Sequence, residues 1–193
     1  MYLRNPDAWK GLCRWVLLSP NMVDSRRYEF EGVGPTIDEG AHVSRESTLI
    51  GDVTVEADAS IWPGVVCRGD VGPVVIGEST HVGDNATLHA SKLGERVMCG
   101  HGAVLNEAIV EDGALVGFNA TLNSGVEVGE RSIVASGTTV SEGYDIPPES
   151  FVRGVPATVS PLEETTIDPE EIFEEHSSGA YTNLAERHGT LFE

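Results

Sequence analysis

Apolar side chains recur at every sixth position along most of this chain. The series runs Ile37, Val43, Leu49, Val55, Ile61 and Cys67, then Ile76, Val82 and Leu88, then Leu93, Cys99 and Leu105, and finally Val110, Val116, Leu122, Val128, Val134, Val140, Ile146 and Val152. An α-helix repeats near 3.6 residues and an ordinary strand repeats at two, so neither explains a period of six. A hexapeptide period is typical of a parallel β-helix, in which each hexapeptide forms one flat face of a coil. The pattern therefore predicts an all-β parallel β-helix over residues 30–158.

The six-residue spacing is interrupted three times. Nine residues separate Cys67 from Ile76, five separate Leu88 from Leu93, and five separate Leu105 from Val110. Three of the six histidines fall in the same interval, 67–110. Regular coils need only to pack, so we expect functional residues at the irregular ones.

The two ends of the chain lie outside the repeat. Residues 1–29 form an N-terminal extension, and Met22 offers an alternative start, so we hypothesise that residues 1–21 come from an upstream start-site assignment. Residues 159–193 form a C-terminal segment in which Asp168 and Pro169 are suited to begin an α-helix. We expect this helix to pack along the outside of the coil or across a subunit boundary.

The chain is strongly acidic, with 31 Asp and Glu against 12 Lys and Arg and a net charge of −19. This charge argues against nucleic-acid or anionic-membrane partners. No apolar run is long enough to span a membrane or to form a signal-peptide core, so we expect a cytoplasmic protein. The excess of carboxylates favours a salt-rich cytoplasm, as in a halophilic archaeon, over an acidic protein of a mesophile. Cys67 and Cys99 occupy apolar repeat positions and are expected to be buried hydrophobic residues.

The period also places the histidines relative to one another. Three hexapeptides make one coil, so residues 17 or 18 apart stack on the same face of adjacent coils. His89 and Asn106 are 17 apart and should be neighbours. His101 lies two faces further round the coil, so it could meet His89 only from a neighbouring subunit in a closed threefold assembly. Any site formed by His89 and His101 is therefore predicted to lie between subunits.

Several segments resemble the gamma-class carbonic anhydrases. They are residues 60–73, which include Arg68-Gly69-Asp70, and residues 84–89, 100–105, 154–157 and 181–187. The resemblance implies a left-handed β-helix, a homotrimer, and a metal bound by three histidines at the subunit interface. It also implies reversible hydration of CO2 to bicarbonate by a metal-bound hydroxide, because a metal brings the pKa of its bound water near neutrality.

His89 and His101 match two of the family's three metal ligands, and Asn106 stands where the family has the third histidine. The family often has Gln at the position of Gly83, where it helps orient the metal-bound water. Zinc prefers nitrogen and sulfur donors, so a neutral Asn carbonyl is a weak ligand. Asn106 could hold a metal weakly, or His81 could replace the missing imidazole. Zn2+, Fe2+ and Co2+ are all chemically reasonable.

Three acidic or basic residues complete the set implied by the resemblance. Arg68 and Asp70 match the family's Arg-Gly-Asp and are expected to form intersubunit ion pairs near the metal, and Asp84 matches a family position close to that interface. The alternative to metal binding is a structural role, in which His89 and His101 are interface histidines bonded to neighbouring carboxylates.

Three functions remain open from the sequence. The first is a trimeric gamma-carbonic-anhydrase-like enzyme whose activity is reduced because Asn106 replaces a ligand. The second is a hexapeptide-repeat acyltransferase, which would use acyl-CoA and an intersubunit histidine as general base. The third is a non-catalytic trimeric scaffold.

Overall fold

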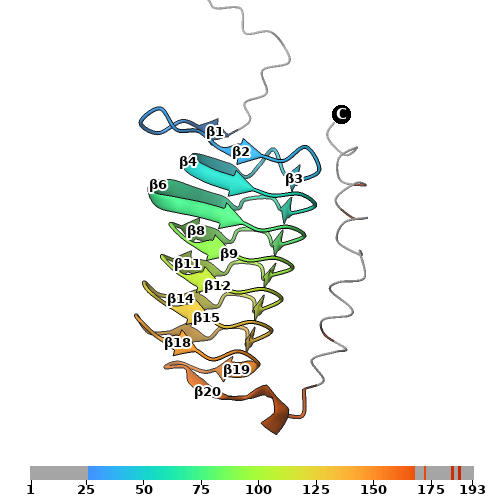
Figure 1. The fold of residues 1–193 in the computed structure, drawn as a ribbon, viewed down its shortest axis with the longest axis vertical. Helices are drawn as coiled ribbons and strands as arrows, with labels where there is room; N and C mark the ends of the chain where they lie inside the picture. The colour runs from blue at the N-terminus through green and yellow to red at the C-terminus, as the bar shows by residue number, and fades with distance from the viewer. Residues whose placement is uncertain (1–25, 168–171, 173–183, 185–186, 188–193) are drawn as a thin grey trace, which may run out of the picture.

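The computed structural model describes residues 26–167 together with Ile172, Leu184 and Arg187. Over 26–167 the chain winds in successive coils stacked along one axis, and the short strands of neighbouring coils align into flat, mostly parallel faces (Figure 1). This is an all-β parallel β-helix of hexapeptide repeats, which confirms the predicted fold class and fits the left-handed type.

The strands form three faces, two of which belong to one 12-stranded sheet. The first face contains β1 (Arg27–Tyr28), the first parts of β4 (Thr48–Val55) and β6 (Val66–Ile76), β8 (Thr87–His89), β11 (Val104–Asn106), β14 (Thr121–Leu122) and β17 (Thr139–Val140). The second face contains β2 (Thr36–Ile37), the last parts of β4 and β6, β9 (Lys92–Leu93), β12 (Ile109–Val110), β15 (Glu127–Val128) and β18 (Asp145–Ile146). The third face is the separate 8-stranded sheet of β3 (His42–Val43), β5 (Ser60–Ile61), β7 (His81–Val82), β10 (Met98–Cys99), β13 (Leu115–Val116), β16 (Ile133–Val134), β19 (Ser150–Arg153) and β20 (Thr158–Pro161).

The repeat residues fill the interior of the coil. Leu88 pairs with Leu105 in the next coil, and Leu105 pairs with Leu122 in the one after. All three are fully buried, and their strand neighbours point outward because side chains alternate along a strand. Cys67 and Cys99 are also fully buried, as expected from their positions in the repeat.

The longest interruption of the repeat is not a separate loop but part of strand β6. In β6, Val75, which pairs with β9, comes seven residues after Arg68, which pairs with β8. In the next coil the partners of these two residues, Lys92 and His89, are only three residues apart. The four additional residues make β6 project where the first and second faces meet (Figure 1). Gly69 is required there, because a Cβ at this position would overlap the backbone carbonyl of Asp52.

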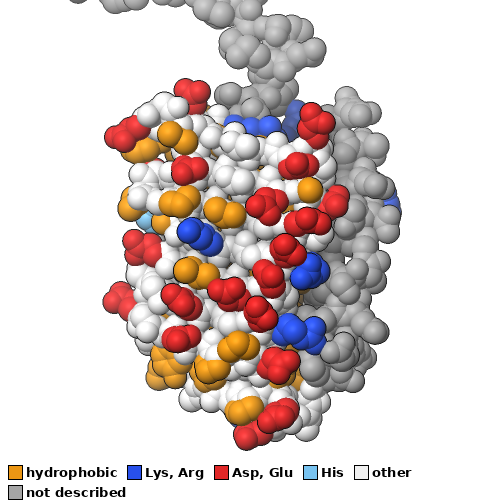
Figure 2. All heavy atoms as spheres, in the orientation of Figure 1, with side chains coloured by type: hydrophobic (Ala, Val, Ile, Leu, Met, Phe, Trp, Pro, Cys, Tyr) orange, Lys and Arg blue, Asp and Glu red, His pale blue; other side chains and the backbone are white. Residues whose placement is uncertain are grey.

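Charge is distributed unevenly over the surface. Figure 2 shows acidic side chains scattered over the second face with few Lys or Arg among them. On the first face the central outward positions are uncharged: Thr48, Val66, Thr87, Val104, Thr121 and Thr139. The first face therefore differs from the rest of a chain whose net charge is −19.

The ends of the coil are described in part. At the N-terminal end, β1 pairs with β4, so Arg27–Tyr28 already belongs to the first face, although the sequence assigns it to the extension. At the other end the antiparallel pair β19–β20 is followed by a 3-10 turn at Leu162–Glu164. Residues 1–25 and most of the predicted C-terminal helix lie outside the described residues. Ile172, Leu184 and Arg187 have helical conformation. Among the described residues, no helix is long and apolar enough to cross a membrane.

Candidate metal centre

The candidate site residues lie along two opposite edges of the first face. Arg68, Asp70, His89 and Asn106 lie at the edge shared with the second face, on β6, β8 and β11. Asp84 and His101 lie at the other edge, in the turns that connect the third face to the first. Within one chain the structure therefore forms two separate groups, as the spacing of His89 and His101 predicts.

His89 is anchored through one of its two ring nitrogens. Strand pairing places Asn106 beside His89 in the next coil, and His89 Nδ1 lies 2.9 Å from Asn106 Oδ1. The Asn106 amide Nδ2 donates to Ser124 Oγ at 2.7 Å, so its oxygen faces His89 and accepts the proton of Nδ1. In neutral His89 the lone pair is then on Nε2.

Asp70 presents one unoccupied oxygen to this lone pair. Arg68 donates from both Nε and Nη2 to Asp70 Oδ2, at 3.1 and 2.8 Å. Asp70 Oδ1 lies 3.3 Å from His89 Nε2, and neither of these two buried atoms has a hydrogen-bond partner among the described residues. The hydrogen bonds from Arg68 are the main cause that lowers the pKa of the Asp70 carboxyl below its ordinary value, and the positive charge of Arg68 adds to this. Two buried acceptor atoms that face each other require a proton or a cation between them.

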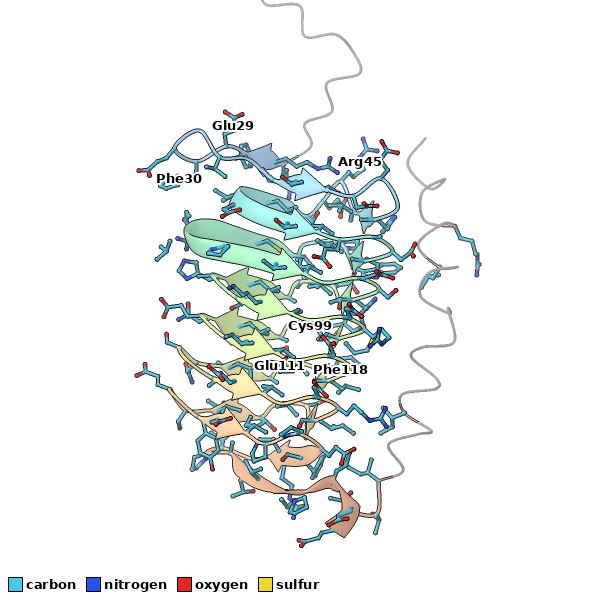
Figure 3. All side chains as sticks on the ribbon, viewed as in Figure 1. Glu29, Phe30, Arg45, Cys99, Glu111 and Phe118 are labelled. Carbon is cyan, nitrogen blue, oxygen red and sulfur yellow. The ribbon has the colours of Figure 1, made fainter. Side chains whose placement is uncertain are left out.

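His101 is held from two sides at the opposite edge. Its Nδ1 lies 2.8 Å from Asp84 Oδ2 and 3.0 Å from the backbone nitrogen of Asp84. The backbone N–H of Asp84 donates to Nδ1 and the Asp84 carboxylate contacts the same nitrogen, so Asp84 fixes the orientation of the ring. The imidazole also stacks on Phe118, with ring centroids 5.1 Å apart. Phe118 is labelled in Figure 3.

Gly83 allows His101 to adopt this position. A Cβ at Gly83 would lie 2.9 Å from both the backbone nitrogen and the Nδ1 of His101. Real Cβ atoms do not approach that closely, so the Gln that the family often has here would displace the imidazole. The observed position of His101 therefore requires a residue without a side chain at position 83.

His81 lies elsewhere, on the third face. It is 5% exposed, and its Nδ1 accepts a hydrogen bond from Trp62 Nε1 at 2.8 Å and lies 3.1 Å from Ser60 Oγ. The structure does not bring His81 to either edge of the first face, and its use as a replacement ligand stays a prediction from the sequence alone.

Sequence reasoning missed two contacts that shape the site. Ser124 follows Asn106 by 18 residues and Phe118 follows His101 by 17, so each stacks one coil further along from a candidate residue. The same spacing that joined His89 to Asn106 could have identified both. Nothing about Ser or Phe, taken as a residue type, suggested a role at a metal site.

The donor atoms of one chain fit a metal in part. No group of three His, Cys, Asp or Glu side chains within the described residues could hold a metal ion. His89 Nε2 and Asp70 Oδ1 are nevertheless two buried acceptor atoms that lie close together, and neither has a hydrogen-bond donor among the described residues. This donor set suits a divalent cation and needs at least one further ligand from outside the chain.

Comparison with known proteins identifies the family. The mitochondrial gamma carbonic anhydrase 1 of Arabidopsis thaliana is 37% identical over 165 residues, which are 80% of this chain and 59% of that protein. A probable carbonic anhydrase of Methanocaldococcus jannaschii is 34% identical over 128 residues, 64% of this chain and 80% of that protein. The chain belongs to the gamma-class carbonic anhydrase family.

Other members of the wider hexapeptide group are also similar to this gamma-class chain. Residues 107–142 match a family model described as the hexapeptide repeat of succinyl-transferase. The crystal structure of a putative acetyltransferase of Bacillus cereus superposes with a TM-score of 0.74 at 28% identity, covering 86% of this chain and 97% of that one. This chain spans about 59% of the length of the plant relative, so family membership alone does not establish its activity.

Proposed function

We propose that this chain forms a homotrimer with a metal ion at each subunit interface, where it catalyses the reversible hydration of CO2. The observation that carries the proposal is the state of His89, whose Nδ1 is anchored by Asn106 while Nε2 is buried without a hydrogen-bond partner among the described residues. A metal-ligating histidine has this arrangement, with its second nitrogen donating to a carbonyl or carboxylate. At the opposite edge, His101 is held by both the carboxylate and the backbone N–H of Asp84.

The uncharged first face supports a trimer. Three copies in a closed ring would bring the His101 edge of one face against the His89 edge of the next copy. Interface cores are depleted of charge, and the central outward positions of this face are Thr or Val. Val104 is 40% exposed and Phe118 is 54% exposed in the single chain, so both offer apolar area to a partner.

A bound Zn2+, Fe2+ or Co2+ ion would lower the pKa of its water so that hydroxide forms near neutral pH. The residues of this chain would provide the ligands and hold them in place. His89 is oriented by Asn106, and His101 is oriented by Asp84 and covered on one ring face by Phe118. Arg68 holds Asp70 beside His89.

Elemental analysis after anaerobic purification, molar mass by light scattering and stopped-flow CO2 hydration test the proposal together. We expect one metal per chain, a trimer, and hydration that chelation abolishes. His89→Ala and His101→Ala should each lose activity, whereas His42→Ala, a histidine on β3 away from both edges, should retain it. Trimers mixed from the two inactive chains should recover part of the activity, because some interfaces then contain both histidines. A metal-free trimer, or hydration that survives chelation, would refute the proposal.

A hexapeptide acyltransferase is the second candidate, supported by the similarity to the Bacillus cereus structure. His89 beside Asp70 is chemically able to act as a general base toward a hydroxyl or amine. Consumption of acetyl-CoA in the presence of small alcohols or amines, lost in His89→Ala and insensitive to chelators, would favour this reading. If acetyl-CoA is not consumed and CO2 hydration depends on the metal, the acyltransferase function is excluded.

A further inference from the structure

We propose that Asp70 is the third metal ligand, so that the site consists of His89 and Asp70 from one chain and His101 from a neighbouring copy. Asn106 is then a positioning residue outside the metal's coordination shell. This inference rests on the proposed function, because it assumes a metal at the interface. Asp70 would then supply the ligand that is lost because Asn106 stands in place of the family's third histidine.

The contacts of Asn106 make it unsuitable as a ligand. Its oxygen already accepts from His89 Nδ1 at 2.9 Å, and its nitrogen donates to Ser124 Oγ at 2.7 Å. Turning the amide oxygen toward a metal would break the first contact and release the imidazole. A neutral amide oxygen is also a poor donor for zinc, cobalt or iron compared with imidazole or carboxylate.

Asp70 has the free donor that Asn106 lacks. Both Arg68 nitrogens converge on Oδ2, which leaves Oδ1 directed at His89 Nε2 with no hydrogen bond among the described residues. A salt bridge with arginine commonly uses both carboxylate oxygens, each with its own N–H group. Here the arginine takes one oxygen and leaves the other available.

The separation of the two atoms matches a shared metal. Bonds of about 2.0–2.1 Å to nitrogen and oxygen at the tetrahedral angle place two ligand atoms about 3.3–3.4 Å apart. Asp70 Oδ1 and His89 Nε2 lie 3.3 Å apart. A direct, linear hydrogen bond between a charged imidazole and a carboxylate would be shorter, about 2.7–2.9 Å. The distance therefore fits two ligands of one metal.

Cobalt binding to the metal-free trimer tests the inference, because Co2+ reports its ligands through visible absorption as well as affinity. Asp70→Asn should lower Co2+ affinity by more than about 100-fold, since changes outside the coordination shell already cost about 10–100-fold. Asn106→Ala should lower it by about 10-fold and leave the band positions unchanged. Asp52→Asn, an exposed carboxylate of neighbouring strand β4, is the matched control and should change neither.

Asp70→Cys provides a positive signal that does not depend on loss of binding. A thiolate at a ligand position should produce a thiolate-to-cobalt charge-transfer band in the near ultraviolet, and Asp52→Cys should produce none. The native Cys67 and Cys99 are fully buried in the coil and should not contribute. Light scattering confirms that each variant remains a trimer.

The outcomes separate this inference from the proposed function. If the wild-type trimer binds no Co2+, both are wrong. If it binds Co2+ through His89 and His101 but Asp70→Asn keeps wild-type affinity and Asp70→Cys shows no charge-transfer band, only the assignment of Asp70 is overturned.

Discussion

Replacing Asn106 by alanine measures the chain of hydrogen bonds that runs from His89 through Asn106 to Ser124. We call these three side chains the 89–124 ladder. Asn106→Ala removes two hydrogen bonds, of 2.9 and 2.7 Å, each with a net value of about 1 kcal/mol. It also leaves His89 Nδ1 without its acceptor, although the His89 side chain is 23% exposed and water can replace part of the loss. We expect the free energy of unfolding to fall by about 2–3 kcal/mol.

A double-mutant cycle isolates the hydrogen bond between Asn106 and Ser124. Ser124→Ala removes one hydrogen bond and should cost about 1 kcal/mol, and the two changes together should be less than additive by about 1 kcal/mol. Urea unfolding of metal-free protein gives these values. Coils of a solenoid can open separately, so hydrogen exchange at the Glu107 N–H, which donates to the His89 carbonyl at 2.8 Å, provides a local measurement.

Thr121→Val is the control on the same face, because it changes an outward side chain that is not part of the 89–124 ladder. It should stay within about 0.5 kcal/mol of wild type. If Asn106→Ala also stays within that margin and is additive with Ser124→Ala, then the amide does not hold His89. In that case Asn106 would not fix the proton on His89 Nδ1.

Four further predictions concern the core and the opposite edge. Burial raises the pKa of the Cys67 and Cys99 thiols to about 12, so iodoacetamide at pH 8 should modify both only after unfolding, as peptide mass spectrometry would show; modification of the native protein would contradict their burial. Unfolded thiols ionise near pH 9 while the folded ones stay neutral, so these two groups should make stability fall as pH rises from 9 toward 12, and a Cys67→Ala/Cys99→Ala variant should show a shallower decline. Gly83→Ala should push the His101 ring off Phe118, and its NMR resonances should lose their ring-current shift; unchanged resonances would show that the backbone can yield. Leu105→Ala, at a fully buried position, should cost about 3–5 kcal/mol in urea unfolding, whereas Val104→Ala on the outer surface should cost less than about 1; equal costs would contradict the alternation of the strand.

The sequence predicted much of the candidate site because the coil converts spacing into contact. A separation of 17 residues places Asn106 directly beside His89, and the strand pairing agrees. The same arithmetic separates His101 from His89 around the coil, and the structure has His101 in the turn at the opposite edge of the first face. The prediction depended only on the period, and a regular solenoid keeps its period from one coil to the next.

Residue spacing could not predict how the side chains at the edges of the first face are oriented. The ion pairs between subunits that the sequence suggested for Arg68 and Asp70 stay a prediction, and within one chain the two residues pair with each other. Which oxygen Arg68 occupies depends on how β6 projects through its register shift against β4. No periodic pattern describes that projection, because it lies where the repeat is interrupted.

By itself, the sequence determined the all-β coil, its buried residues and the stacking of His89 with Asn106, because one repeated period controls burial and pairing along the whole solenoid. Only the tertiary structure decided that Asn106 gives its oxygen to His89 Nδ1 and that Asp70 keeps Oδ1 free. Hydrogen-bond direction depends on positions that differ by fractions of an ångström, and those are settled by the local packing of adjacent coils and the projection of β6.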